Sequence, residues 1–122
     1  MPRRKHAENC TIPAWASGRL DCRERRFIQV GCTLFFDQSF QLLSAGAKHL
    51  YFCMCLECGG RRTFDFPHGA AKKFGIPSRS FDRYSAELVE AGFLSKISGR
   101  NTRTANTFTF EFAWKKRQLE PP

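Results

Sequence analysis

The longest helical pattern in the chain covers residues 45–57, where apolar side chains recur at intervals of three and four residues. Ser44 stands before this segment and is a favoured N-cap residue, and the pair Gly59 and Gly60 ends it. Because further apolar residues widen the stripe beyond one face, we expect this helix at the centre of the fold, packed on several sides. Its apolar positions are Ala47, Leu50, Tyr51, Phe52, Cys53, Met54, Cys55 and Cys58.

Two more helices are predicted at about residues 67–74 and 79–91, separated by a tight turn. Pro67 suits the first turn of the shorter helix, since its missing N–H leaves no bond unmade there. Ser78 is a good N-cap for the longer helix, which Gly92 closes. The inner faces carry Ala70, Ala71 and Phe74 in the shorter helix, and Phe81, Leu88 and Val89 with Tyr84 or Ser85 in the longer one.

Alternation of apolar and polar residues predicts three short strands, at residues 61–66, 94–98 and 107–112. A polar and basic loop of residues 99–106 joins the last two strands into a hairpin. The aromatic residues that share an inner face are Phe64 and Phe66 in the first strand and Phe108, Phe110 and Phe112 in the third.

The segment 27–36 is rich in aromatic and β-branched residues, which predicts a strand or an extended segment leading into the core. Asp37 follows it and suits the N-cap of a short helix that carries Phe40, Leu42 and Leu43.

The 122 residues, 42% of them hydrophobic and 13 of them Phe, are enough for one folded domain with a real core. Apolar periodicity is absent from residues 1–26, where basic residues outnumber acidic ones, so we expect a basic N-terminal arm there. The predicted domain covers residues 27–114, with Trp114 as an anchor, and residues 115–122 form a polar tail.

From Ser44 onward the predicted order is helix, short strand, short helix, turn, longer helix, strand, basic loop and strand. Two helices joined by a tight turn are the arrangement in which the second helix enters the major groove of DNA, and the hairpin that follows would be a wing. The sequence therefore predicts an α+β fold, a winged helix-turn-helix with a three-helix core, a short strand and a C-terminal β-hairpin wing.

Charge favours a polyanionic partner, because 20 Lys and Arg residues stand against 11 Asp and Glu, a net charge of +9. Nucleic acid is the first candidate and an anionic membrane surface the second. No apolar run approaches the roughly 20 residues that a membrane span needs. The basic N-terminus is followed by no apolar segment of a secretory signal, so we expect the protein in the cytoplasm.

The predicted contacts to double-stranded DNA come from three places in the fold. Side chains at the leading end of the second helix reach base edges, and arginine pairs best with guanine. Lysines on the supporting helix and basic residues in the wing suit phosphates. The candidate residues are Lys72, Lys73, Ser78, Arg79, Ser80, Arg83, Arg100, Asn101 and Arg103. Each group has a plain alternative as solvated surface charge.

Six cysteines in a cytoplasmic setting are expected as free, buried thiols rather than disulfides. Cys55 and Cys58 have the spacing of half a zinc site, and no second pair with matching spacing is found. His49 and Cys53 lie one turn apart on the same predicted helix and keep a zinc site open as an alternative. We predict no cofactor and no bound metal.

No catalytic set is recognised in the sequence. His6, His49 and His68 have no carboxylate or nucleophile at a recognisable spacing, and the acidic residues are scattered. The glycines at 59–60 lack the pattern that holds phosphates. We therefore expect the protein not to be an enzyme.

Five stretches within residues 27–112 carry a resemblance to known proteins: Phe27-Ile-Gln-Val30, Phe40-x-x-Leu-Ser44, Ala47-x-x-Leu-Tyr51, Ala70-Ala-Lys-x-Phe-Gly75-Ile-x-x-x-x-Phe81 and Leu88-Val-Glu-Ala-Gly-Phe-Leu94. With these stretches the segment resembles the winged-helix domains of replication initiators from bacterial plasmids, phages and other mobile elements, and in part those of MarR-like and GntR-like regulators. The resemblance implies binding to duplex DNA, in transcription regulation or in replication control of a mobile element.

The predicted function is sequence-specific binding of double-stranded DNA. The main alternative is a protein–protein interaction module on the same fold, which should present an exposed apolar patch. A third is an RNA-binding winged helix, which charge alone does not separate from a DNA-binding one. No dedicated dimerisation helix is recognised, so a homodimer would have to use residues 1–43 or the tail.

Overall fold

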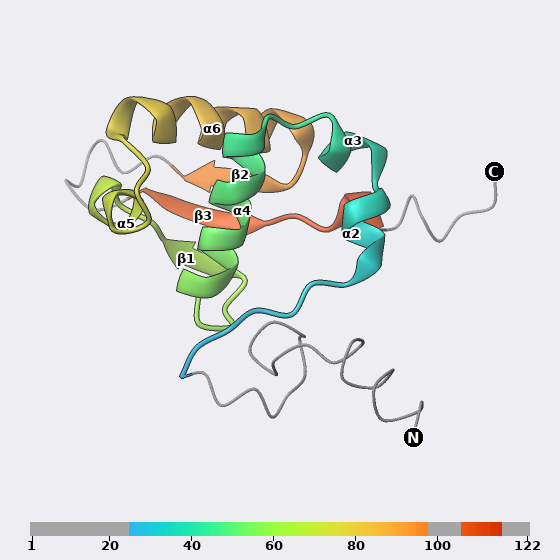
Figure 1. The fold of residues 1–122 in the computed structure, drawn as a ribbon, viewed down its shortest axis with the longest axis horizontal. Coiled ribbons are helices and arrows are strands. Elements are labelled where there is room, and N and C mark those ends of the chain that lie inside the picture. The colour runs from blue at the N-terminus through green and yellow to red at the C-terminus, as the bar shows by residue number, and fades with distance from the viewer. Residues whose placement is uncertain (1–24, 98–105, 116–122) are drawn as a thin grey trace, which may run out of the picture. The chain divides into compact units, whose positions relative to one another are not determined.

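The computed structural model describes residues 25–97 and 106–115. Residues 1–30 and 31–122 form two separate units, and the helices and strands of the described residues all belong to the second. Its order matches the one predicted from Ser44 onward. The elements are α2 (Cys32–Phe36), α3 (Gln38–Gln41), α4 (Ala45–Glu57), β1 (Thr63–Asp65), α5 (His68–Lys73), α6 (Ser78–Ala91), β2 (Leu94–Ile97) and β3 (Thr107–Phe110), with one further helical turn at 113–115 (Figure 1).

Local capping determines where several helices begin. The carboxylate of Asp37 accepts a hydrogen bond from the backbone N–H of Phe40 at 3.1 Å, so α3 begins where the sequence predicted. The hydroxyl of Ser44 accepts from the N–H of Ala47 at 3.2 Å and caps α4. The predicted bounds of α4, residues 45–57, are confirmed.

Two of the predictions about helix starts are wrong by one residue. Ser78 is the first residue of α6 and not its cap, because Pro77 holds the cap position with ψ of 153° and accepts from the N–H of Phe81 at 2.8 Å. Pro67 likewise stands at the cap of α5, with ψ of 167°, rather than inside its first turn. The proline ring restrains φ but leaves ψ to decide whether the residue is extended or helical.

The segment 32–36 is the helix α2, so the predicted strand there is wrong. Leu34 is its one buried residue, whereas Phe35 and Phe36 are 50% and 74% exposed. Strand preference of aromatic residues reflects how they fit a pleated surface between neighbouring strands. Among the described residues no strand pairs with this segment, so the preference is not expressed.

The three strands form one antiparallel sheet in the order β1-β3-β2. Phe64 pairs with Phe108, and Leu94 pairs with Phe110, so large buried side chains occupy one face. The predicted alternation is confirmed for these residues. The strand β3 ends two residues before Phe112, which stacks on Phe110 and is 44% exposed.

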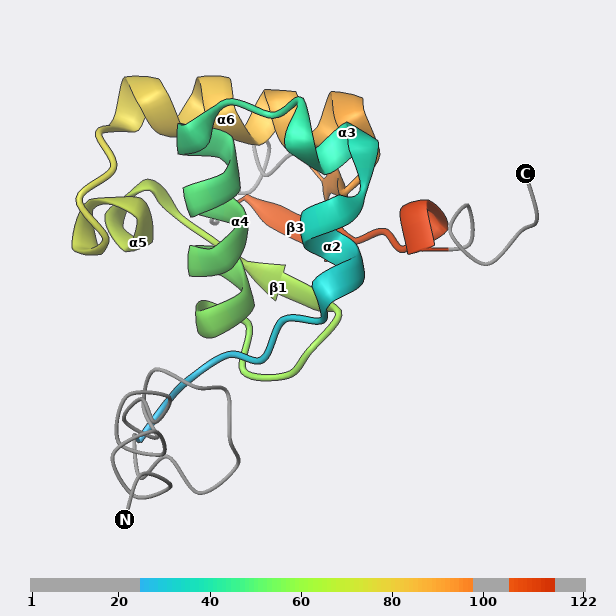
Figure 2. The same ribbon diagram turned by 45° about the vertical axis from the view of Figure 1, so that its right-hand side comes forward.

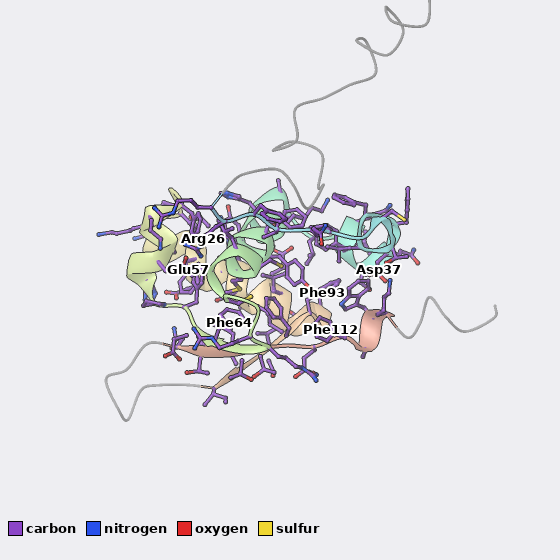
Figure 3. All side chains as sticks on the ribbon, turned by 90° about the horizontal axis from the view of Figure 1, so that it is seen from below. Arg26, Asp37, Glu57, Phe64, Phe93 and Phe112 are labelled. Atoms are coloured by element: carbon purple, nitrogen blue, oxygen red, sulfur yellow. The ribbon has the colours of Figure 1, made fainter. Side chains whose placement is uncertain are left out.

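The helices cover this apolar face. Figure 3 shows the sheet edge-on, with the helices on one side of it. Helix α4 lies at the centre of the fold, and its Ala47, Leu50 and Met54 are fully buried. Figures 1 and 2 both show α5 beside the N-terminal end of α6, with α3 near the other end. The core therefore fixes α6 along its whole length.

Candidate nucleic-acid interface

The helices α5 and α6 meet at a tight turn that contains Gly75. Its φ of 82° lies in the left-handed region that favours glycine, and its N–H donates to the carbonyl of Lys72 at 2.9 Å. The next residue, Ile76, is buried, and its N–H donates to the carbonyl of Ala71 at 2.9 Å. These contacts end α5 and set the direction in which α6 leaves.

The inner face of α6 is buried against the rest of the core. Phe81 and Leu88 have no exposed side-chain surface, and Ser85 is 1% exposed with its hydroxyl donating to the carbonyl of Asp82 at 3.1 Å. The sequence left Tyr84 and Ser85 as alternatives for this face. Ser85 is the buried one, and Tyr84 is half-buried beside α4.

The outer face of α6 points away from the core and is graded in charge. Its residues are three and four positions apart, which places them on one face of a helix. Its N-terminal half carries two arginines and one aspartate, and its C-terminal end carries a glutamate. The exposed residues on it are Arg79, Asp82, Arg83, Ala86 and Glu90.

Tyr84 connects this face to the central helix. The Arg83 guanidinium lies over the Tyr84 ring, 5.2 Å from the ring centroid, and its Nη2 lies 3.5 Å from the tyrosine hydroxyl. The ring also lies against Gly46 of α4, where a Cβ atom would be 2.0 Å from the ring carbon Cζ. A glycine at this position therefore allows the two helices to approach and seats the ring that carries Arg83.

A second contact between α4 and α6 joins Glu87 to Ser44, the N-cap residue of α4. Both carboxylate oxygens of Glu87 accept hydrogen bonds from Ser44, one from its backbone N–H at 2.6 Å and one from its hydroxyl at 2.8 Å. The negative charge thus lies at the N-terminus of α4, where the helix dipole favours it. Glu87 is therefore held at the cap of α4 by Ser44.

His68 and Asp82 join α5 directly to α6. The imidazole Nε2 lies 2.9 Å from the Asp82 Oδ1, and the ring meets Phe81 edge-on at 4.9 Å between centroids. The sequence predicted no carboxylate partner for His68, because fourteen residues separate the pair and no motif marks it. In the part of the chain that the structure describes, no nucleophile is bonded to this imidazole.

The two candidate lysines of α5 differ in their surroundings. Lys73 forms an ion pair with Glu57 of α4 at 2.7 Å, with the Lys73 side chain 56% exposed. Lys72 is exposed, and no acidic side chain among residues 25–97 and 106–115 pairs with it. Lys72 is therefore the freer of the two for a phosphate.

The predicted wing residues Arg100, Asn101 and Arg103 lie outside the described residues. The strands that lead to them are paired up to Ile97 and Thr107. Lys96, one residue earlier, is exposed and its ammonium lies 5.9 Å from the centroid of the Phe108 ring. This cation is absent from the candidates predicted from sequence, although its place next to the basic loop was a signal.

The thiols of α4 are in an apolar setting. Burial, and then the neighbouring Cys58 and Cys53, raise the pKa of Cys55 to about 12, and burial raises the pKa of Cys53. The thiol of Cys58 donates a hydrogen bond to the carbonyl oxygen of Cys55 at 3.2 Å. Within residues 25–97 and 106–115, no three His, Cys, Asp or Glu side chains are grouped so as to hold a metal ion.

A shallow hollow of about 260 Å³ lies between α3 and the C-terminal end of α6, lined by Ser39, Leu42, Leu43, Glu87, Glu90 and Ala91. Leu42 at its edge is 79% exposed, and Phe35 and Phe36 on α2 are also exposed. Figure 2 shows α2 and α3 toward the C-terminal end of α6, whereas α5 lies at its N-terminal end.

Comparison with known proteins gives no relative for this chain, since no family model, no curated protein and no solved structure matches it. Among the described residues, no helix has the length and apolar character needed to cross a membrane.

Proposed function

We propose that this protein binds double-stranded DNA sequence-specifically, through a winged helix-turn-helix in which α5 supports α6 and α6 enters the major groove. The observation that carries the proposal is the outer face of α6. Arg79 and Arg83 project there from the N-terminal half, on the side opposite the buried Phe81 and Leu88. N-terminal residues of a recognition helix are those that reach base edges.

The order of elements and the sheet support the winged-helix assignment. A three-helix core of α4, α5 and α6 is followed by the hairpin of β2 and β3, and β1 completes the sheet beside β3. In this assignment the residues between the two hairpin strands are the wing, and they contact the sugar-phosphate backbone or the minor groove.

Groove geometry favours duplex DNA over duplex RNA. The major groove of B-form DNA is about 12 Å wide and admits a helix, whereas the RNA major groove is deep and too narrow for side chains to read. Ala86 lies on the same face as the arginines and is small enough to allow close approach to the base pairs. Either arginine suits guanine, whose O6 and N7 accept two parallel hydrogen bonds.

Net charge supports the same partner. With a formal charge of +9, the protein would release condensed counterions from a polyanion, and the basic residues of the N-terminal arm would add affinity without specificity. Regulation of transcription or control of replication in a mobile element is the process we propose for this activity.

Fluorescence anisotropy with random duplex DNA, single-stranded DNA and duplex RNA, titrated with salt, tests the proposal. We expect a preference for duplex DNA and an affinity that falls steeply with salt, with a log–log slope of about 0.9 per phosphate contact. Absence of binding to all three at low salt would refute the proposal.

Removing single charges then tests the site. Arg79→Ala and Arg83→Ala should each reduce discrimination between a selected site and a scrambled one by about 1–3 kcal/mol if the arginine reads a guanine. Arg61→Ala is the matched control, since Arg61 is an exposed arginine before β1 and away from α6. Equal effects of all three variants would show that the arginines of α6 contribute only general charge attraction and read no base.

A second candidate, a protein-interaction module, is favoured by the exposed Phe35, Phe36 and Leu42. Large exposed apolar side chains mark interaction surfaces, and these three lie within residues 1–43, one of the two segments that a homodimer would have to use. Sedimentation of the protein and of a Phe36→Lys, Leu42→Lys variant tests this candidate. A dimer that the double variant abolishes would support it, and a monomer in both cases would remove the homodimer.

A further inference from the structure

Asp82 places a negative charge in the cationic N-terminal half of the outer face of α6. It lies three residues after Arg79 and directly before Arg83, and its side chain is 61% exposed. A carboxylate at this point opposes general attraction to phosphates, because like charges repel at close range. In a DNA interface, a carboxylate contributes favourably only where a hydrogen-bond donor faces it.

The hydrogen bonds of Asp82 leave both arginines available. Its Oδ1 is held by the Nε2 of His68 on α5 at 2.9 Å, and neither Arg79 nor Arg83 forms an ion pair with it among the described residues. His68 in turn is fixed edge-on against the buried Phe81. The carboxylate is therefore oriented by the supporting helix, and its second oxygen, Oδ2, has no partner in the described part of the chain.

Base chemistry then selects a ligand for that oxygen. An ionised carboxylate only accepts hydrogen bonds. In the major groove cytosine presents the N4 amino donor, and aspartate or glutamate accepts from it. Adenine also presents an amino group, but its N7 acceptor is adjacent and repels a carboxylate. Cytosine is thus the base that fits Asp82.

Resting on the DNA-binding function proposed above, we infer that Asp82 is a specificity-determining residue that accepts a hydrogen bond from N4 of a cytosine in the major groove. His68 is its positioning residue. The carboxylate also disfavours duplexes without that cytosine, since its charge then faces the site without a donor.

The experiment selects sites for the wild-type protein from a duplex library with a randomised centre. In the selected site, each cytosine is then replaced by N4-methylcytosine, whose methyl group removes the major-groove donor. The 5-methylcytosine duplex is the matched control, because it keeps that donor. We expect one position at which N4-methylation weakens binding about tenfold, within the usual range for one good base contact, while 5-methylation there has a smaller effect.

Variants of Asp82 and His68 test whether Asp82 is the residue that contacts this cytosine. Asp82→Asn keeps an acceptor for His68 and should move the preference from cytosine toward adenine, which asparagine pairs with through N6 and N7. Asp82→Ala should lose the preference at that position and bind random duplex more tightly. His68→Ala should weaken the preference, and His68→Gln should restore part of it, because its amide can donate to Oδ1.

The outcomes separate this inference from the function on which it rests. If the wild-type protein selects a site but Asp82→Asn selects the same site, Asp82 only links α5 to α6 and the inference is wrong. Glu90→Gln, on the same face near the other end of α6, should leave the selected site unchanged. If the wild-type protein selects no site and binds no duplex, the proposed function itself fails and the inference fails with it.

Discussion

Replacing Gly46 by alanine places a methyl group where the Tyr84 ring lies. The new Cβ would be 2.0 Å from Cζ and 2.3 and 2.5 Å from the two Cε atoms of the ring. Carbon atoms in contact are normally about 3.5–4.0 Å apart, so the ring has to move by about 1.5 Å or more. The tyrosine is half-buried and can swing outward, but it then loses its packing on α4.

The expected cost follows from two opposing effects. Overpacking of this kind typically costs about 1–3 kcal/mol. Replacing glycine by alanine within a helix stabilises the helix by up to about 1 kcal/mol. We therefore expect Gly46→Ala to lower the free energy of unfolding by about 1–2 kcal/mol.

Gly69→Ala is the matched control. Gly69 is the second residue of α5, as Gly46 is the second residue of α4, and nothing lies within 4 Å of the position that its Cβ would take. The control should be neutral or stabilising by up to about 1 kcal/mol. Urea denaturation followed by circular dichroism at the helix band measures both variants against wild type.

A double-mutant cycle decides whether the ring is responsible. In a Tyr84→Ala background the three atoms nearest to the added methyl group are gone, so Gly46→Ala should cost less there. If Gly46→Ala stabilises the wild-type protein as much as Gly69→Ala does, or costs the same with and without the tyrosine ring, the packing argument is refuted.

Three further predictions concern the cap, the thiols and the core. Ser44→Ala should lower the free energy of unfolding by about 0.5–2 kcal/mol, because the hydroxyl caps α4; an unchanged urea midpoint would contradict this. Cys55, whose pKa is raised to about 12, should react with iodoacetamide more slowly at pH 8 than the exposed Cys32, since only the thiolate reacts. The rate of Cys55 should keep rising above pH 9. Equal rates for the two thiols, measured by peptide mass mapping, would exclude the raised pKa. Phe93→Ala removes a fully buried ring and should lower the free energy of unfolding by about 3–5 kcal/mol. Phe36→Ala removes a ring that is 74% exposed and should change it by less than about 0.5 kcal/mol. Similar unfolding midpoints for the two variants would contradict the difference in burial.

Most helix ends were predictable because they depend on neighbours in the chain. The caps at Asp37 and Ser44 are bonds between residues three positions apart. Gly92 has φ of 91° and closes α6, as its place in the sequence indicated. The strand or extended segment predicted for residues 27–36 was wrong at 32–36, which form α2. Strand preference needs a neighbouring strand, and none of the described strands pairs with this segment.

The candidate site was predictable only in part. Exposure of Arg79 and Arg83 followed from the spacing of apolar residues on the opposite face of α6. The ion pair that occupies Lys73 was not predictable, since Glu57 belongs to another helix and sixteen residues separate them. The wing residues lie outside the described residues, so their part in the site stays a prediction.

Local sequence is enough to place the main helices and the inward faces of the strands, because caps, glycines and periodicity act over a few residues. Which distant side chains meet depends on the assembled fold. His68 orients Asp82, Gly46 seats Tyr84, and Glu87 binds the cap of α4 through Ser44. Each of these contacts depends on how two helices cross, and the crossing is set by packing of the whole core rather than by the residues that meet there.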